Sequence, residues 1–100
     1  MATNEEQLLA IRSKINSLDD EISKLLNRRL ELALELAQIK HGLDIPIEDR
    51  SRENEILDRV AEHTDNPEIA KAIHSVYRSI FEVSRNLQKK LYDPQRKSWV

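Results

Sequence analysis

The sequence predicts an all-α protein of three helices, one of them very long, that forms an intertwined homodimeric helical bundle. Its 100 residues include one Gly and three Pro, and 34% of them are charged, which is the composition of a long-helix protein. Apolar residues recur at steps of three and four, the spacing of one helical face. A chain of this length holds one domain at most. The composition therefore excludes an all-β or α/β fold.

The first predicted helix runs from Asn4 to about His41. Thr3 is a capping residue with Glu6 three positions later, and Gly42 is the expected stop. Apolar residues at heptad spacing form a seam along the helix, and one cation interrupts it. The seam positions are Leu8, Ile11, Ile15, Leu18, Ile22, Leu25, Arg29, Leu32, Leu36 and Ile39.

This helix is too long for one chain to cover. Residues 5–41 span roughly 55 Å at 1.5 Å per residue, whereas a compact domain of this size has a radius of gyration of about 13 Å. Further apolar residues widen the stripe, so the helix needs burial from more than one side. These residues are Leu26, Leu30, Ala33, Leu34 and Ala37. We therefore expect a homodimer rather than a monomer.

Two shorter helices follow. Pro46 keeps residues 42–48 extended, and a helix begins near Asp49 and ends before Asn66. Its apolar face comprises Ile56, Leu57, Val60 and Ala61.

The third helix begins at Pro67, behind an Asn66 cap, and Pro94 ends it. Its apolar stripe comprises Ile69, Ile73, Val76, Ile80, Val83, Leu87 and Leu91. We assign residues 1–92 to one helical domain and residues 93–100 to a C-terminal tail or linker stub.

Several functional classes are disfavoured. The chain has no Cys, and its three His occur in no metal-binding spacing, so we expect no metal and place the protein in the cytoplasm. Apolar runs of about four residues are too short for a membrane span or signal peptide. A formal net charge of −2 argues against nucleic-acid binding.

Arg29 is the first candidate site residue, because a guanidinium on an apolar seam needs an anion. Lys40 lies eleven residues later and projects from nearly the same side of the helix. Arg12 points about 100° away, so it can serve only a partner's site. The structural alternatives for Arg29 are a side chain that extends its charge to solvent, a polar residue that fixes helix register, or a buried ion pair with Glu35 or another acid.

The third helix carries Tyr77, Phe81, Ser84 and Gln88 on one face, so an apolar stripe ends in two hydrogen-bonding side chains. This pattern indicates either a pocket lined by polar side chains or a position at the boundary between the core and the solvent. No nucleophile with a base and no glycine-rich phosphate loop is present. We therefore expect a small, multiply charged anion as ligand, and catalysis by conformational restriction and placed positive charge.

These residues resemble the all-helical AroQ class of chorismate mutase over about residues 7–91. The resemblance is carried by Leu9-Ala10-Ile11-Arg12, Ile15, Leu18-Asp19, Leu25-Leu26, Arg28-Arg29, Lys40, Pro46-Ile47-Glu48-Asp49-Arg50-Ser51-Arg52-Glu53, Ser84 and Gln88. It implies an intertwined dimer that rearranges chorismate to prephenate without a cofactor.

The resemblance also implies roles for individual residues. Arg29 and the partner's Arg12 would bind the two substrate carboxylates. Lys40 and Gln88 would donate to the ether oxygen. Glu53 and the backbone of Asp49 would hold the ring hydroxyl, and Arg52 and Ser84 would complete the pocket. Two alternatives stay open: an inactive helical dimerisation or regulatory module, and a related lyase that releases pyruvate from isochorismate.

Overall fold

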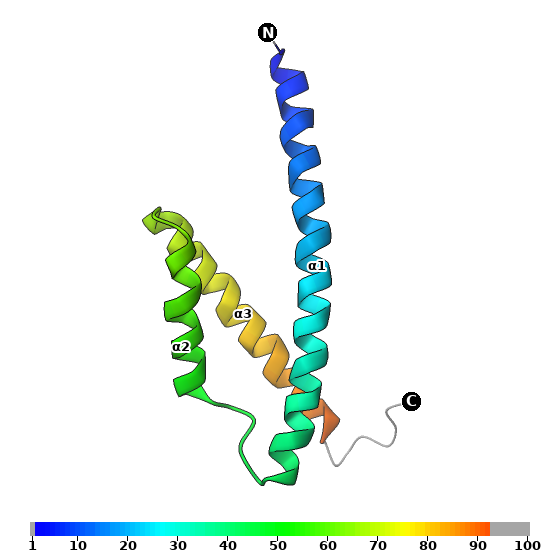
Figure 1. The fold of residues 1–100 in the computed structure, drawn as a ribbon, viewed down its shortest axis with the longest axis vertical. Helices are drawn as coiled ribbons and strands as arrows, with labels where there is room; N and C mark the ends of the chain where they lie inside the picture. Colours follow the sequence, from blue (N-terminus) through cyan, green and yellow to red (C-terminus); the bar gives the residue numbers. More distant parts are fainter. Residues whose placement is uncertain (1, 93–100) are drawn as a thin grey trace. The chain divides into compact units, whose positions relative to one another are not determined.

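The computed structural model describes residues 2–92, which form three α-helices and one short 3₁₀ turn (Figure 1). Helix α1 spans Asn4–Gly42, α2 spans Arg50–Val60, and α3 spans Pro67–Leu91, with the 3₁₀ turn at Ala61–His63 between α2 and α3. No β-strand occurs in this part of the chain. The predicted all-α class with one long helix is confirmed, whereas the predicted tail and Pro94 lie outside the described residues.

Local capping sets the helix starts as predicted. Thr3 Oγ1 accepts a hydrogen bond from the Glu6 amide at 3.1 Å, and Asp49 Oδ1 accepts one from the Arg52 amide at 3.0 Å. Asn66 Oδ1 accepts from the amides of the second and third residues of α3, directly before Pro67. Each cap satisfies backbone donors that the first helical turn leaves free.

Helix α1 ends at the predicted Gly42, but the left-handed backbone conformation that reverses the chain occurs at another residue. Gly42 belongs to the helix, and Asp44 adopts the left-handed conformation with φ of 56°. Asp tolerates this region better than most residues. The Ile45 amide then donates to the Lys40 carbonyl at 2.8 Å, which satisfies an acceptor in the last turn of α1.

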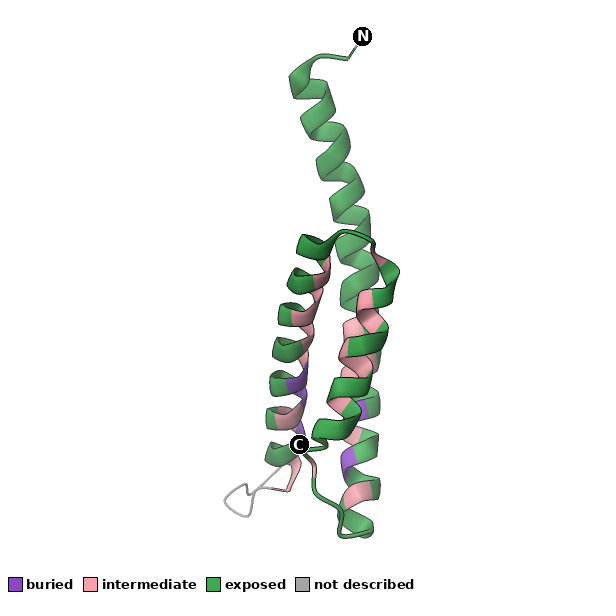
Figure 2. Ribbon diagram, turned by 90° about the vertical axis from the view of Figure 1, so that its left-hand side faces the viewer, coloured by how far each residue is buried: buried purple, intermediate pink, exposed green. Residues whose placement is uncertain are grey.

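The chain divides into two compact units, of which the first comprises residues 2–32 of the described chain. This unit is a single stretch of α1. Most of its large apolar side chains are exposed to solvent, as the green colour in Figure 2 shows. The exposed ones are Leu8, Leu9, Ile11, Ile15, Leu18, Ile22, Leu25 and Leu32. The predicted apolar seam therefore exists, and nothing within this unit covers it.

The second unit comprises residues 33–92 of the described chain and has a small core. Ala33 and Ala37 from the end of α1 are buried, as is Phe81 from α3. Ser84 and Gln88 of α3 are also buried, although both are polar. Between α2 and α3, the His74 Nε2 atom lies 2.9 Å from the Leu57 carbonyl, which accepts its hydrogen bond.

Part of the predicted apolar stripe of α3 is not covered within the single chain. Ile69, Val76 and Val83 belong to this stripe, and all three are exposed. They recur every seven residues, and α3 buries a neighbouring face through Phe81 and Ser84. Helix α3 thus has two apolar faces, and only one is covered within the chain. None of the described helices is apolar and long enough to span a bilayer.

Candidate active site

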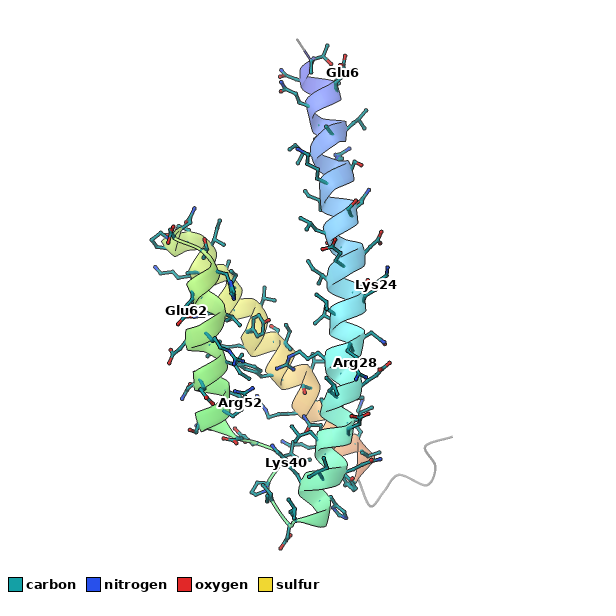
Figure 3. All side chains as sticks on the ribbon, in the orientation of Figure 1. Glu6, Lys24, Arg28, Lys40, Arg52 and Glu62 are labelled. Carbon is teal, nitrogen blue, oxygen red and sulfur yellow. The ribbon has the colours of Figure 1, made fainter. Side chains whose placement is uncertain are left out.

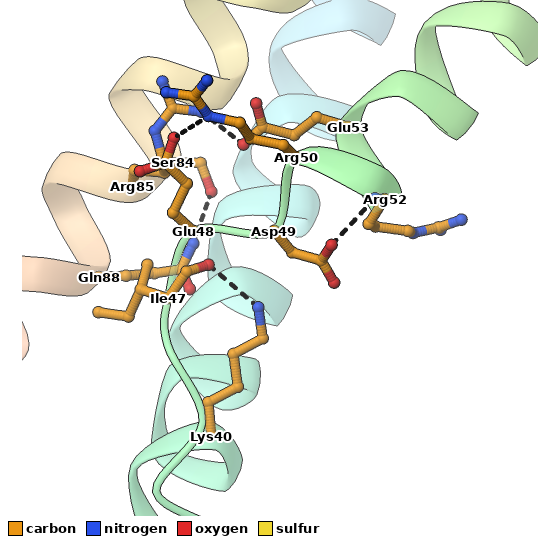
Figure 4. Close-up of polar contacts among 10 residues, drawn as sticks. All are labelled: Lys40, Ile47, Glu48, Asp49, Arg50, Arg52, Glu53, Ser84, Arg85 and Gln88. Carbon is orange, nitrogen blue, oxygen red and sulfur yellow. Dashed lines mark hydrogen bonds and ion pairs between the residues drawn. The ribbon is translucent and has the colours of Figure 1, made fainter.

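The second unit gathers predicted site residues from three helices and the loop before α2 (Figure 4). Lys40 reaches from the last turn of α1 toward that loop (Figure 3). Its Nζ atom donates to the Ile47 carbonyl at 3.1 Å in a half-buried position. The charge of Lys40 is thereby held beside the loop that leads into α2.

Ser84 and Gln88 lie one turn apart on α3 and are each only 6% exposed. The Gln88 Nε2 atom donates to Ser84 Oγ at 3.0 Å. The Gln88 Oε1 atom is buried and has no hydrogen-bond partner among the described residues. An unsatisfied buried polar atom costs free energy, so Gln88 Oε1 needs a hydrogen-bond donor from outside the described residues.

The start of α2 contributes three predicted residues in different ways. The Asp49 carboxylate caps the helix, so its side chain is already engaged by backbone. Arg52 extends along α2 and pairs with Glu55 at 3.3 Å, where both side chains are at least half exposed. Figure 4 shows the Arg52 side chain directed away from Ser84 and Gln88. The structure therefore does not bring Arg52 to the buried pair.

Glu53 forms an ion pair that the sequence analysis missed. Arg85 of α3 donates from Nη1 to Glu53 Oε2 at 2.5 Å, and the two side chains are 24% and 22% exposed. The hydrogen bond to Glu53 raises the pKa of Arg85 further above its ordinary value, so Arg85 stays charged. The available sequence signal was a basic residue directly after Ser84.

The Arg85–Glu53 pair lines a pocket of about 560 Å³ between α2 and α3. Its walls carry several charges of both signs together with apolar surface from Leu57 and Phe81. The remaining lining residues are Glu48, Arg50, Asn54, Arg78 and Glu82. At its rim, Arg50 donates from Nε to Glu48 Oε1 at 3.1 Å, and this hydrogen bond lowers the pKa of Glu48.

Arg12 and Arg29 belong to the first unit, on the earlier part of α1. Their approach to the residues of the second unit stays a prediction. Within residues 2–92, no group of three His, Asp or Glu side chains has the arrangement of a metal site.

Comparison with known proteins gives a consistent likeness. The family model described as chorismate mutase type II matches residues 11–89. A chorismate mutase of Methanocaldococcus jannaschii is 36% identical over 95 residues, which cover 93% of this chain and 96% of the relative. A bifunctional chorismate mutase/prephenate dehydratase of Aquifex aeolicus is 33% identical over 86% of this chain, but the match spans only 25% of that longer protein.

Solved structures show the same likeness. The chorismate mutase of Thermus thermophilus in its form II has a TM-score of 0.77 at 26% identity, covering 92% of this chain and all of that chain. The chorismate mutase of Helicobacter pylori in complex with prephenate has a TM-score of 0.75 at 34% identity, covering 90% of this chain and 98% of that one.

Proposed function

The chain belongs to the chorismate mutase type II family, and we propose that two copies of it rearrange chorismate to prephenate in sites that both copies build. The observation that carries this proposal is the buried Ser84–Gln88 pair with its unpartnered amide oxygen. A buried amide next to a hydroxyl is suited to a polar ligand, and it supplies no nucleophile.

The reaction needs no nucleophile. In the intramolecular [3,3] rearrangement a C–O bond breaks, a C–C bond forms, and no atom is gained or lost. The ether oxygen gains negative charge as its bond to carbon breaks. An enzyme therefore accelerates this step by holding the reactive conformation and by placing donors at that oxygen.

Lys40 and Gln88 are the proposed donors to the ether oxygen. The Lys40 ammonium has three donors and spends one on the Ile47 carbonyl, so two remain. Gln88 presents its Nε2 atom to a ligand when its amide turns by half a rotation. Ser84 can then donate its hydroxyl proton to the Gln88 oxygen, because a hydroxyl serves as donor or acceptor.

The other roles come from the family resemblance. Arg29 and the partner's Arg12 bind the two carboxylates of chorismate, while Glu53 and the backbone of Asp49 hold the ring hydroxyl. Arg52 turns from Glu55 toward the substrate, which is a small cost because exposed ion pairs contribute about 0 to 1 kcal/mol. No cofactor takes part, and we place the reaction in the cytoplasm.

The exposed apolar residues support the second copy. Full burial of one Leu or Ile side chain contributes about 1.5 to 3 kcal/mol, and residues 2–32 expose eight such side chains. The seam continues through Leu36 and Ile39, which are exposed as well. Pairing of α1 with a second copy covers this surface and brings the partner's Arg12 to the site.

Mixing of inactive variants tests the shared site. Arg12→Ala and Arg29→Ala homodimers should each lose most activity, since each lacks one carboxylate clamp at both sites. In a heterodimer one of the two sites has both arginines. A random mixture after co-refolding should therefore recover about a quarter of the parental turnover, measured by chorismate consumption with prephenate identified as product.

Arg28→Ala is the matched control, because Arg28 is an exposed neighbour paired locally with Glu31. It should stay active as a homodimer. A stable, active monomer in sedimentation would contradict the shared site, as would an inactive preparation of verified heterodimers. Release of pyruvate would instead assign a lyase reaction to the same residues.

A further inference from the structure

The contact between Arg85 and Glu53 differs from the other ion pairs that the structure gives. Arg28–Glu31, Arg50–Glu48 and Arg52–Glu55 are local pairs within three residues, and at least one side chain of each pair is half exposed or more. Arg85 and Glu53 are 32 residues apart, join α3 to α2, and are both about three-quarters buried. Burial of two charges is costly, so such a pair is weak evidence for stability and invites another explanation.

The geometry leaves half of the Glu53 carboxylate available. Arg85 binds Oε2, and no described residue donates a hydrogen bond to Oε1. A carboxylate whose one oxygen is anchored presents the other in a fixed direction. Glu53 and Arg85 both line the 560 Å³ pocket, so a small molecule bound there lies beside the carboxylate.

Arg85 also prevents competing contacts. Arg50 lies three residues before Glu53 on α2, so a freed Glu53 carboxylate can compete with Glu48 for the Arg50 guanidinium. With Arg85 in place, Glu53 is drawn toward α3 rather than along α2 (Figure 4). We therefore expect removal of Arg85 to change the orientation of the Glu53 carboxylate more than the folding of α2.

We propose that Arg85 is a positioning residue for substrate recognition, which fixes Glu53 so that its second oxygen accepts the ring hydroxyl of chorismate. This inference rests on the proposed function, since that function places Glu53 at the hydroxyl. The hydroxyl is on the ring carbon next to the one whose C–O bond breaks, but it makes and breaks no bond and develops no charge, so its contact changes little between the ground state and the transition state. Such contacts affect KM and leave kcat nearly unchanged.

The test compares Arg85→Met, Arg85→Lys and Glu53→Gln with the parent. Arg85→Met should raise KM for chorismate about tenfold with kcat within about twofold, the loss expected for one charge-assisted hydrogen bond. Arg85→Lys keeps the charge and should recover part of that loss. In the Glu53→Gln background, Arg85→Met should add little, because both changes remove the same contact. Lys90→Met removes a positive charge from the exposed end of α3 and is the matched control.

An analogue of chorismate with hydrogen in place of the ring hydroxyl gives the decisive readout. For this analogue, Arg85→Met and the parent should have the same KM. If Arg85 only ties α2 to α3, the variant will lose melting temperature and bind both substrates equally less well, which overturns the inference. An unchanged KM for chorismate also overturns it while the proposed function stands. A parent without mutase activity overturns the proposed function itself, and the inference with it.

Discussion

The two units of this chain differ in how much of their apolar surface is buried within a single copy of the protein. Residues 33–92 bury Ala33, Ala37 and Phe81 and hold polar side chains in defined contacts. Residues 2–32 form one regular helix in which no residue is buried. Both units carry proposed site residues, with Arg12 and Arg29 in the first and the rest in the second.

This difference shows that helix formation and helix burial are separate problems. The first unit has a good cap, few helix breakers and a continuous heptad seam, so its backbone conformation follows from local sequence. Burial of its apolar seam would stabilise the protein, but the first unit has no surface of its own to bury the seam against. The second unit buries some of its apolar side chains by itself, and it holds the buried Gln88 amide whose oxygen has no partner among the described residues. We infer that the first unit is built for assembly and the second for recognition.

The largest expected effect comes from a charge on the seam of the first unit. Ile15→Asp should dissociate the proposed dimer, because a symmetric interface would bury two unpaired carboxylates. The monomer should lose helicity in α1, and turnover should fall by at least about a hundredfold, as the partner's Arg12 is lost from each site. Sedimentation velocity, circular dichroism and the chorismate assay measure the three effects.

Ser13→Asp adds the same charge on the opposite side of α1 and is the control for Ile15→Asp. It should leave the dimer and the activity intact. If Ile15→Asp remained a fully active dimer, the distinction between an assembling unit and a recognising unit would be wrong.

The next effect concerns the buried amide of the second unit. Gln88→Glu should lower kcat/KM at neutral pH by about 10²- to 10³-fold, because a carboxylate offers lone pairs to an oxygen that is itself becoming negative. A glutamic acid side chain donates only when protonated, so activity should recover as pH falls. The parent amide does not titrate and should show no matching rise. Profiles of kcat/KM from about pH 4.5 to 8, with circular dichroism at each pH, measure this.

Gln88→Leu separates the donor from the pH effect. It removes the donor without adding a carboxylate, so its activity should be low at every pH. A flat profile for Gln88→Glu, or full activity at neutral pH, would mean that Gln88 does not face the reacting oxygen. The dimer should persist in both variants, since the change lies in the recognising unit.

Sequence predicted the features that depend on local residues. The three caps and helix starts follow from Thr3, Asp49 and Asn66, whose partners are two or three residues away. The spacing of Ser84 and Gln88 predicted that they share one face of α3, but it left open whether that face lines a pocket or lies at a boundary; both residues are buried. The sequence did not predict which apolar face of α3 the single chain covers. Val76 and Val83 have the correct helical period, but the period does not say which face the chain itself covers.

Long-range charge pairing is the other feature that the sequence did not predict. Sixteen basic and eighteen acidic residues allow many pairs, and nothing local links Arg85 to Glu53. Their contact depends on how α2 packs against α3, which is set by apolar residues elsewhere. Family resemblance identified Glu53 but not the residue that holds it.

The smallest expected effect is at Glu48, on the exposed rim of the pocket. The hydrogen bond from Arg50 lowers the pKa of Glu48 in the folded protein, so the folded state releases this proton more readily than the unfolded chain. Its stabilising contribution is therefore present above the ordinary pKa of Glu and is lost as pH falls through the lowered value. Both side chains are largely accessible to solvent, so salt screens the pair and the contribution is minor. Glu48→Gln should melt slightly below the parent at pH 7 and together with it at about pH 3, at equal protein concentration. A large decrease at pH 7, or a difference that persists in acid, would show that the rim of the second unit depends on Glu48 for packing rather than for charge.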